Sequence, residues 1–197
     1  KRLVNEEGLL DLLLVDAGSR QTSVKTRYLA DGQQILRTDH ETIFDLNNSI
    51  EEKLIAQAVK AMQSCDVVIL SDYAKGILTN KTIIELIKAA KVGSKVVIVD
   101  PKGGDYDRYR GADIITPNRR ELFEATGMPT DSDHEVTMAA QSLIDMHSFG
   151  AVLATRSMDG MTLLKKDGGL SHLRAETIDV FDVSGAGDTV VATLAAA

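Results

Sequence analysis

Short β-branched runs alternate with amphipathic stretches along most of the chain from about residue 60. Residues 66–70 and 95–99 are rich in Val and Ile and predict two buried strands, because polar or turn-forming residues close each run. Between them, residues 79–92 carry apolar side chains at helical spacing and are followed by Gly93, a typical helix stop. A strand, a helix and a strand in this order indicate a right-handed crossover in a parallel sheet.

The same pattern repeats toward the C-terminus. Residues 113–116 predict a third strand, and residues 151–155 predict a fourth. The segment between them predicts a short helix over 118–126 and a longer one over 133–147, and residues 51–62 predict a further helix. The fold class is therefore α/β, with a core of helices and mostly parallel strands.

Two segments read as β-hairpins rather than crossover units. Residues 24–30 and 34–38 are β-like and are separated by an Ala-Asp-Gly turn. Residues 160–165 and 169–174 form a similar pair around Asp167 and Gly168. The first hairpin predicts an antiparallel appendage near the N-terminus of the α/β core.

Composition narrows the class of protein. The 197 residues are 44% hydrophobic and 26% charged, which is typical of a globular chain. The net charge of −7 argues against a broad nucleic-acid surface, and no apolar run approaches the ~20 residues of a membrane span. Cys65 is the only cysteine, so a disulfide framework is excluded. We expect a cytoplasmic protein without membrane or nucleic-acid partners.

Polar and glycine-rich segments follow the predicted strands. Ligands of open α/β sheets bind beyond the carboxyl ends of the strands, so these segments hold the candidate site residues. The candidates are Tyr73, Lys75, Asp100, Lys102, Asn118, Glu121, Thr155, Ser157, Gly160, Asp182, Ser184, Gly185, Ala186, Gly187 and Asp188.

The most informative segment is Gly-Ala-Gly-Asp at residues 185–188, which precedes a helix-compatible stretch. A glycine-rich turn at a helix N-terminus points backbone N–H groups and the positive end of the helix dipole at one place, where an anion can bind. Asp188 beside that anion could take a proton from an attacking hydroxyl. The alternative is a tight turn in which Asp188 only complements the dipole.

The other segments also have structural readings. Asn118 and Glu121 could present an amide and a carboxylate to metal-bound phosphate, but their spacing also matches a helix capping box. Residues 100–103 could be a plain turn, and residues 72–75 could be a solvated loop. No single segment decides between these interpretations.

Taken in order, the motifs resemble the ribokinase-like carbohydrate kinases of the phosphofructokinase B type. Residues 182–188 are similar to that family's second signature, and residues 118–121 are similar to its Asn-x-x-Glu motif. Residues 155–160 resemble a nucleotide-side segment that usually reads Thr-x-Gly-x-x-Gly. The resemblance implies a ribokinase-like fold, with a mostly parallel sheet flanked by helices and a small antiparallel β lid.

The resemblance also implies roles for the candidates. Asp188 matches the catalytic base, and the N–H groups of residues 185–187 match the anion hole for the transferring phosphoryl group. Asn118 and Glu121 match the positions that organise magnesium, the Glu through water. The nucleotide side comprises Asn118, Glu121, Thr155, Ser157, Gly160, Asp182 and Ser184, and contacts to phosphate or sugar are expected from Tyr73, Lys75, Asp100 and Lys102.

Within the family, residues 71–76, 100–103, 108–112 and 155–157 look most like the heptose 7-phosphate kinase domain of the bacterial ADP-heptose synthases, and residues 37–41 fit its lid strand. This implies transfer of the ATP γ-phosphoryl group to the anomeric hydroxyl of D-glycero-D-manno-heptose 7-phosphate, with Mg²⁺ and a monovalent cation. It also implies a homodimer through the lid and an adenylyltransferase domain on the same parent chain. The alternatives are a fructokinase or ribokinase type of sugar kinase, and a nucleotide-binding fragment without catalysis. A dinucleotide-binding dehydrogenase has little support, because the third glycine of its motif is missing.

Three departures from the family pattern bear on these expectations. Ser157 replaces the usual glycine, which would strain the loop if the backbone there needs a positive φ. Ser184 replaces the more usual threonine and keeps its hydroxyl. The family's N-terminal strands and final helices are not found, so we expect one incomplete kinase domain, with a lid over about residues 20–42 and an α/β core over about 43–197.

Overall fold

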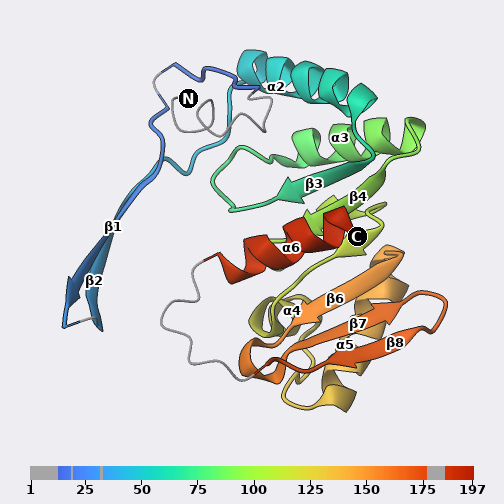
Figure 1. Ribbon diagram of the computed structural model, residues 1–197. Helices are drawn as coiled ribbons and strands as arrows, with labels where there is room; N and C mark the ends of the chain where they lie inside the picture. Colours follow the sequence, from blue (N-terminus) through green and yellow to red (C-terminus); the bar gives the residue numbers. More distant parts are fainter. Residues whose placement is uncertain (1–12, 19, 32, 177–184) are drawn as a thin grey trace.

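The computed structural model describes residues 13–18, 20–31, 33–176 and 185–197. Its main sheet has six strands in the order β3-β4-β5-β6-β7-β8 (Figure 1). The strands pair in parallel from β3 to β6 and antiparallel from β6 to β8. Their bounds are β3 Val67–Ser71, β4 Val96–Asp100, β5 Ile114–Ile115, β6 Ala151–Thr155, β7 Met161–Lys165 and β8 Leu170–Leu173. The predicted strands are confirmed, and the second predicted hairpin continues the same sheet.

The first hairpin stands apart from this sheet. Strands β1 (Val24–Ala30) and β2 (Gln33–His40) pair antiparallel, with an irregularity between Tyr28 and Leu29. Every described residue of both strands is exposed, and Figure 1 shows the hairpin projecting away from the helices and the six-stranded sheet. The predicted antiparallel appendage is therefore present, and its second strand is longer than the pattern indicated.

Helices cover the sheet. They are α2 Asn48–Ala61, α3 Asn80–Val92, α4 Arg119–Thr126, α5 Asp133–His147 and α6 Ala186–Ala196. Helix α6 contacts β3 and β4, whereas α5 contacts β6 and β7. Figure 1 shows α6 in front of the sheet and α5 behind β7 and β8. Helix α2 begins three residues before the predicted start, because the side chain of Asn47 accepts a hydrogen bond from the N–H of Ile50 (3.0 Å) and caps it.

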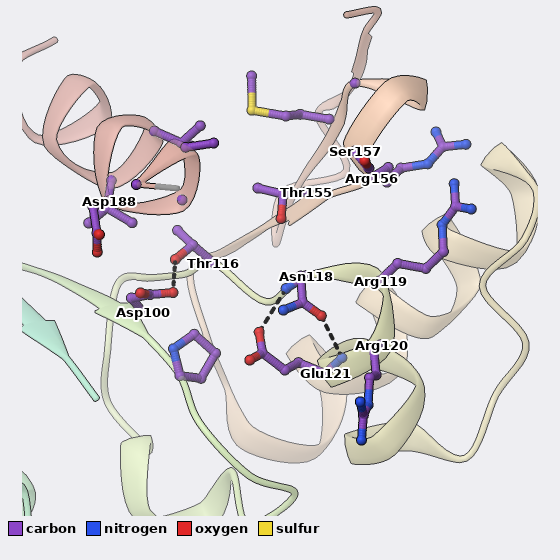
Figure 2. A pocket seen from close by; sticks show the side chains of 18 of the residues that line it. Asp100, Thr116, Asn118, Arg119, Arg120, Glu121, Thr155, Arg156, Ser157 and Asp188 are labelled. Carbon is purple, nitrogen blue, oxygen red and sulfur yellow. Dashed lines mark hydrogen bonds between the residues drawn. The ribbon is translucent and has the colours of Figure 1, made fainter. Parts of the chain in front are cut away.

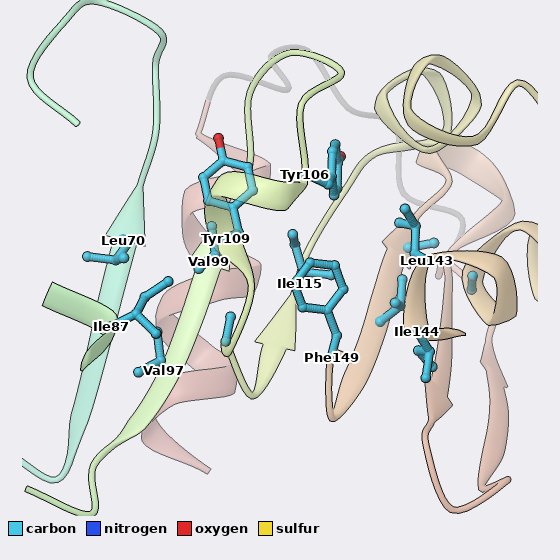
Figure 3. Close-up of a cluster of buried hydrophobic side chains, with 14 of the residues drawn as sticks. Leu70, Ile87, Val97, Val99, Tyr106, Tyr109, Ile115, Leu143, Ile144 and Phe149 are labelled. Atoms are coloured by element: carbon cyan, nitrogen blue, oxygen red, sulfur yellow. The ribbon is translucent and has the colours of Figure 1, made fainter. Parts of the chain in front are cut away.

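The core lies between the sheet and these helices (Figure 3). Three consecutive residues of β4 are almost fully buried, as expected for a central parallel strand covered on both faces. Aromatic rings fill the space beside β5, where Tyr106 and Tyr109 meet edge to face with their centroids 5.8 Å apart. Figure 3 labels these buried side chains: Leu70, Ile87, Val97, Val99, Tyr106, Tyr109, Ile115, Leu143, Ile144 and Phe149. Each such side chain contributes about 1.5–3 kcal/mol by burial.

Candidate active site

A cavity of about 800 Å³ opens at the carboxyl ends of the parallel strands (Figure 2). Its walls come from the ends of β3, β4 and β6, from the start of α4, from the end of β8 and from the start of α6. Twelve of the fifteen sequence candidates line it: Tyr73, Asp100, Lys102, Asn118, Glu121, Thr155, Ser157, Gly160, Gly185, Ala186, Gly187 and Asp188. This volume is in the ordinary range for a small-molecule or cofactor site.

Three candidates are not brought to this cavity by the described residues. Asp182 and Ser184 lie outside the described residues. Lys75 does not line the cavity, and its ammonium group instead pairs with the carboxylate of Glu41 at the end of the hairpin. The guanidinium of Arg20 binds the carbonyl oxygen of Lys75, so this lysine belongs to the junction between hairpin and core.

The N-terminus of α6 faces the cavity. Gly185 is its N-cap residue, with a φ of 80°, and Ala186, Gly187 and Asp188 form the first turn. Within the described ranges no side chain caps this helix, so its first backbone N–H groups remain open to an anion. Asp188 accepts a hydrogen bond at Oδ1 from the phenol of Tyr73 (2.9 Å). A helix N-terminus without a side-chain cap among the described residues and an acidic side chain therefore lie next to each other.

Asn118 and Glu121 do form the capping box of α4. The side chain of Asn118 accepts from the N–H of Glu121 (2.9 Å), and Glu121 Oε2 accepts from the N–H of Asn118 (3.0 Å). The other carboxylate oxygen of Glu121 binds the ammonium of Lys102 (2.6 Å), and this bond raises the pKa of Lys102. The structural reading of the Asn-x-x-Glu spacing is thus realised, and the same side chains also line the cavity.

Asp100 lies beside this pair at the end of β4. Its Oδ1 atom is 3.5 Å from the hydroxyl of Thr116 (Figure 2). Burial raises the pKa of Asp100 to about 6, and the nearby carboxylates of Glu121 and Asp188 add to the effect. The carboxylates of Asp100, Glu121 and Asp188 therefore lie close enough to influence one another, with Lys102 paired to Glu121 among them.

Several arginines that were not among the sequence candidates also line the cavity. Arg119, Arg156 and Arg174 lie among the lining residues. Arg119 pairs with Asp159, and the buried guanidinium of Arg156 pairs with Asp133 and binds the hydroxyl of Thr162 (3.1 Å). Arg119 and Arg156 occupy variable positions within the two motifs, so the only sign of them in the sequence is that they lie next to motif residues. Guanidinium groups are suited to binding phosphate, and two of these three are already paired with an aspartate.

Ser157 takes the backbone conformation that was in question. Its φ is 55°, in the left-handed region that favours glycine. The loop is closed by hydrogen bonds from the N–H of Arg156 to the carbonyl of Gly160 (2.8 Å) and from the N–H of Gly160 to the carbonyl of Ser157 (3.0 Å). The loop is not shifted away from this geometry, so Ser157 carries the strain.

An α/β fold that places an open helix N-terminus, an adjacent carboxylate and basic side chains around one cavity is typical of enzymes that transfer phosphoryl groups. The comparison with protein families agrees. Residues 2–197 match the pfkB family carbohydrate kinase domain, and the chain belongs to this family, whose enzymes transfer a phosphoryl group to a sugar hydroxyl.

Curated relatives and solved structures extend this result. The chain is 53% identical over 196 residues to the "Bifunctional protein HldE" of Paramagnetospirillum magneticum and 45% identical over 196 residues to that of Mesorhizobium japonicum. All of this chain is covered in both matches, but it spans only 40% and 39% of the relatives' length.

The tetrameric inhibited form of phosphofructokinase-2 from Escherichia coli matches with a TM-score of 0.80 and 18% identity, covering 99% of this chain and 64% of that one. Arabidopsis thaliana ribokinase complexed with ribose and ATP matches with a TM-score of 0.62 and 21% identity, covering 82% and 52%. The expected ribokinase-like fold is confirmed.

None of the helices among the described residues is long and apolar enough to cross a membrane. Across the same part of the chain, no group of three or more His, Cys, Asp or Glu side chains is placed to hold a metal ion.

Proposed function

We propose that the chain carries the kinase activity that its motifs imply, transfer of the ATP γ-phosphoryl group to the anomeric hydroxyl of D-glycero-D-manno-heptose 7-phosphate. The observation that carries the proposal is the position of Asp188 beside the open N-terminus of α6, in a cavity lined by arginines. The name of the relatives, "Bifunctional protein HldE", and the resemblance of residues 71–76 and 100–103 to heptose 7-phosphate kinases support the choice of sugar.

In the proposed phosphoryl transfer the protein forms no covalent bond to either substrate. Asp188 accepts the proton of the sugar hydroxyl as its oxygen attacks the γ-phosphorus of ATP. The new O–P bond forms while the bond from the γ-phosphorus to the bridging β,γ-oxygen breaks, and ADP leaves with that oxygen. Negative charge then grows on the transferring group, where the N–H groups of residues 185–187 can stabilise it.

Basic side chains on the opposite wall would balance the rest of the nucleotide charge. Arg119, Arg156 and Arg174 line that wall, next to Thr155 and Ser157. Arg156 is nearly fully buried and fixed by Asp133 and Thr162, so it shapes the loop more than it offers a free guanidinium. Arg119 is likewise paired, with the exposed Asp159. Arg174 forms no ion pair with another described residue and is therefore the better partner for phosphate oxygens.

The residues present fit a hydrated magnesium ion. Asp100, Glu121 and Asn118 offer the hard oxygen donors that Mg²⁺ prefers, and the acidic wall lacks an equal number of cations. Both oxygens of Glu121 already accept hydrogen bonds, which suits a contact through water. Bound there with ATP, Mg²⁺ would neutralise charge on the β- and γ-phosphates. A monovalent cation stays an expectation from the family resemblance.

An adenylyltransferase unit and a second copy of this chain are proposed as partners of the kinase. The relatives are named as bifunctional proteins, in line with an adenylyltransferase unit on the same parent chain. The hairpin carries exposed apolar side chains on both strands, among them Leu29 and Ile35. Such a surface supports pairing with the hairpin of a second copy.

The test is an ADP-release assay with Mg-ATP over heptose 7-phosphate, fructose 6-phosphate, fructose and ribose. We expect turnover to be fastest with heptose 7-phosphate, and faster turnover with another sugar would overturn the choice of substrate. Asp188→Asn should lower kcat by at least about 10³-fold with little change in nucleotide binding, because it removes only the base. Asp145→Asn, on the exposed face of α5, is the matched control.

A thermal-shift measurement separates the remaining alternative. A rise in Tm with Mg-ATP but no ADP release with any of the sugars would favour the nucleotide-binding fragment over the kinase. Equal turnover in Asp188→Asn and wild type would remove Asp188 from the role of base.

A further inference from the structure

Tyr73 contacts the helix that carries the proposed base. It is the second residue after β3, lines the cavity and donates its phenolic hydrogen to Oδ1 of Asp188 at 2.9 Å. The two residues are 115 positions apart in the chain. Within the described ranges, the second carboxylate oxygen of Asp188 has no hydrogen-bond partner.

The turn that presents Tyr73 is held from beneath by a buried carboxylate. Asp72 Oδ1 accepts from the N–H of Ala74 (2.8 Å), and the N–H of Asp72 donates to the carbonyl of Asp100 (2.9 Å). Ala74 has a φ of 51°, which an alanine adopts only under constraint. Tyr73 is thus fixed between a residue anchored to β4 and a residue in a strained conformation.

A second layer of side chains holds Asp72 itself. Its Oδ2 accepts from the phenol of Tyr109 (2.7 Å) and lies 3.6 Å from the guanidinium of Arg108. That guanidinium also lies 5.5 Å from the centre of the Tyr109 ring. Asp72 is only 4% exposed, and a buried carboxylate is tolerated only when it is paired and hydrogen-bonded as here. The buried, charged side chain of Asp72 therefore helps to fix the turn that holds Tyr73 in place.

We propose that Tyr73 is the positioning residue for Asp188, an inference that rests on the proposed function. Its hydroxyl fixes the carboxylate by binding Oδ1 and leaves Oδ2 as the oxygen that accepts the proton of the sugar hydroxyl. An exposed aspartate in a first helical turn otherwise samples several rotamers, and small misplacements of a reacting group lower rates strongly. The phenol does not exchange a proton in the reaction, because it remains the donor to Oδ1 before and after the transfer.

The kinetic test compares two Tyr→Phe variants. Tyr73→Phe keeps the ring and removes the bond to Asp188, and we expect kcat to fall about tenfold while KM for ATP stays within about twofold. Tyr106→Phe is the matched control, since its buried hydroxyl has no hydrogen-bond partner among the described residues, and its kcat should not change. An unchanged kcat in Tyr73→Phe, or an equal loss in kcat and ATP binding, would overturn the inference.

A second measurement does not depend on turnover. The hydrogen bond to Asp188 raises the pKa of Tyr73, with burial and the more distant charge of Asp100 adding to it and a contact with Ser71 opposing it. The Tyr73 signal in a ¹³C-tyrosine NMR titration is assigned from its loss in Tyr73→Phe. We expect its midpoint to move to lower pH in Asp188→Asn and to stay in place in Asp145→Asn.

The two readouts separate the two proposals. No turnover in wild type together with the expected tyrosine shift would refute the kinase and keep the contact. Turnover that collapses in Asp188→Asn but not in Tyr73→Phe would keep the kinase and refute the positioning role. An unchanged tyrosine midpoint in Asp188→Asn would refute the contact itself.

Discussion

Gly160 closes the loop beside the cavity, and its replacement by alanine tests how closely that loop is packed. Its φ of 84° is combined with a ψ of −131°, a region that residues with a Cβ avoid. A Cβ built there would overlap the carbonyl oxygen of Leu173 and would lie 2.7 Å from the backbone nitrogen of Ala175. These are main-chain atoms, so no side-chain rotation can relieve the overlap.

The size of the effect follows from two contributions. The backbone conformation alone costs about 1–3 kcal/mol in a residue with a Cβ. Displacing the end of β8 puts Gly160→Ala among the rare substitutions that destabilise by about 4 kcal/mol or more. At about 2–4 °C per kcal/mol for a chain of this size, Tm should fall by roughly 10 °C. Nucleotide binding should weaken as well, because residues 173–175 line the cavity.

Gly168→Ala is the matched control. Gly168 has a φ of 92°, and no atom lies within 4 Å of a Cβ built on it. It should cost only the backbone contribution of about 1–3 kcal/mol, with nucleotide binding unchanged. Both variants are compared by thermal melting and by titration with Mg-ATP. An equal loss of Tm in the two would show that the contact with β8 is absent and would refute the reasoning.

Three further predictions concern other residues. Ser157→Gly removes the strain of a φ of 55° and should raise Tm by about 2 °C, and Ser148→Gly, where φ is 62°, should do the same. Of the two variants, only Ser157→Gly should change the affinity for Mg-ATP measured by calorimetry. The hydrogen bond from Thr79 is the main cause that lowers the pKa of buried Glu51 below its usual 4.5, so the stability that the ionised Glu51 contributes is present above pH 4.5 and is lost as pH falls. The Tm difference between wild type and Glu51→Gln should therefore become smaller in acid, and a constant difference would contradict this. The pKa of Asp100 is raised from 3.8 to about 6, so the stability that its protonated form contributes is complete below pH 3.8 and is lost as pH rises through 6. Asp100→Asn should therefore have a higher Tm than wild type at pH 8 but not near pH 4, and the reverse order would refute the raised pKa.

Local pattern was sufficient for most of the fold. The strands β3, β4 and β6 were predictable because each is a short β-branched run, and α5 was predictable from its apolar spacing and its Ser132 cap. The capping reading of Asn118 was also visible in the sequence, since it depends on residues three positions apart. These features are determined by neighbours along the chain.

Contacts between distant segments were beyond sequence pattern. Lys75 was expected at the site, but Glu41 pairs with it across the base of the hairpin, 34 positions away. The burial of Arg156 depends on Asp133 at the start of α5, and a charged residue after a strand gives no sign of such a partner. The bond between Tyr73 and Asp188 likewise requires the sheet to bring β3 and α6 together.

The hairpin β1–β2 contributes much less to the stability of the fold than the α/β part does. Because all its described side chains are exposed, it shares none of the buried surface that makes the rest of the fold cooperative. Its strands can separate and re-form without loosening the sheet, and isolated two-stranded hairpins are marginal in water. The hairpin amides should thus exchange with solvent long before those of β4, and a melting curve of the single chain will report on the α/β part alone.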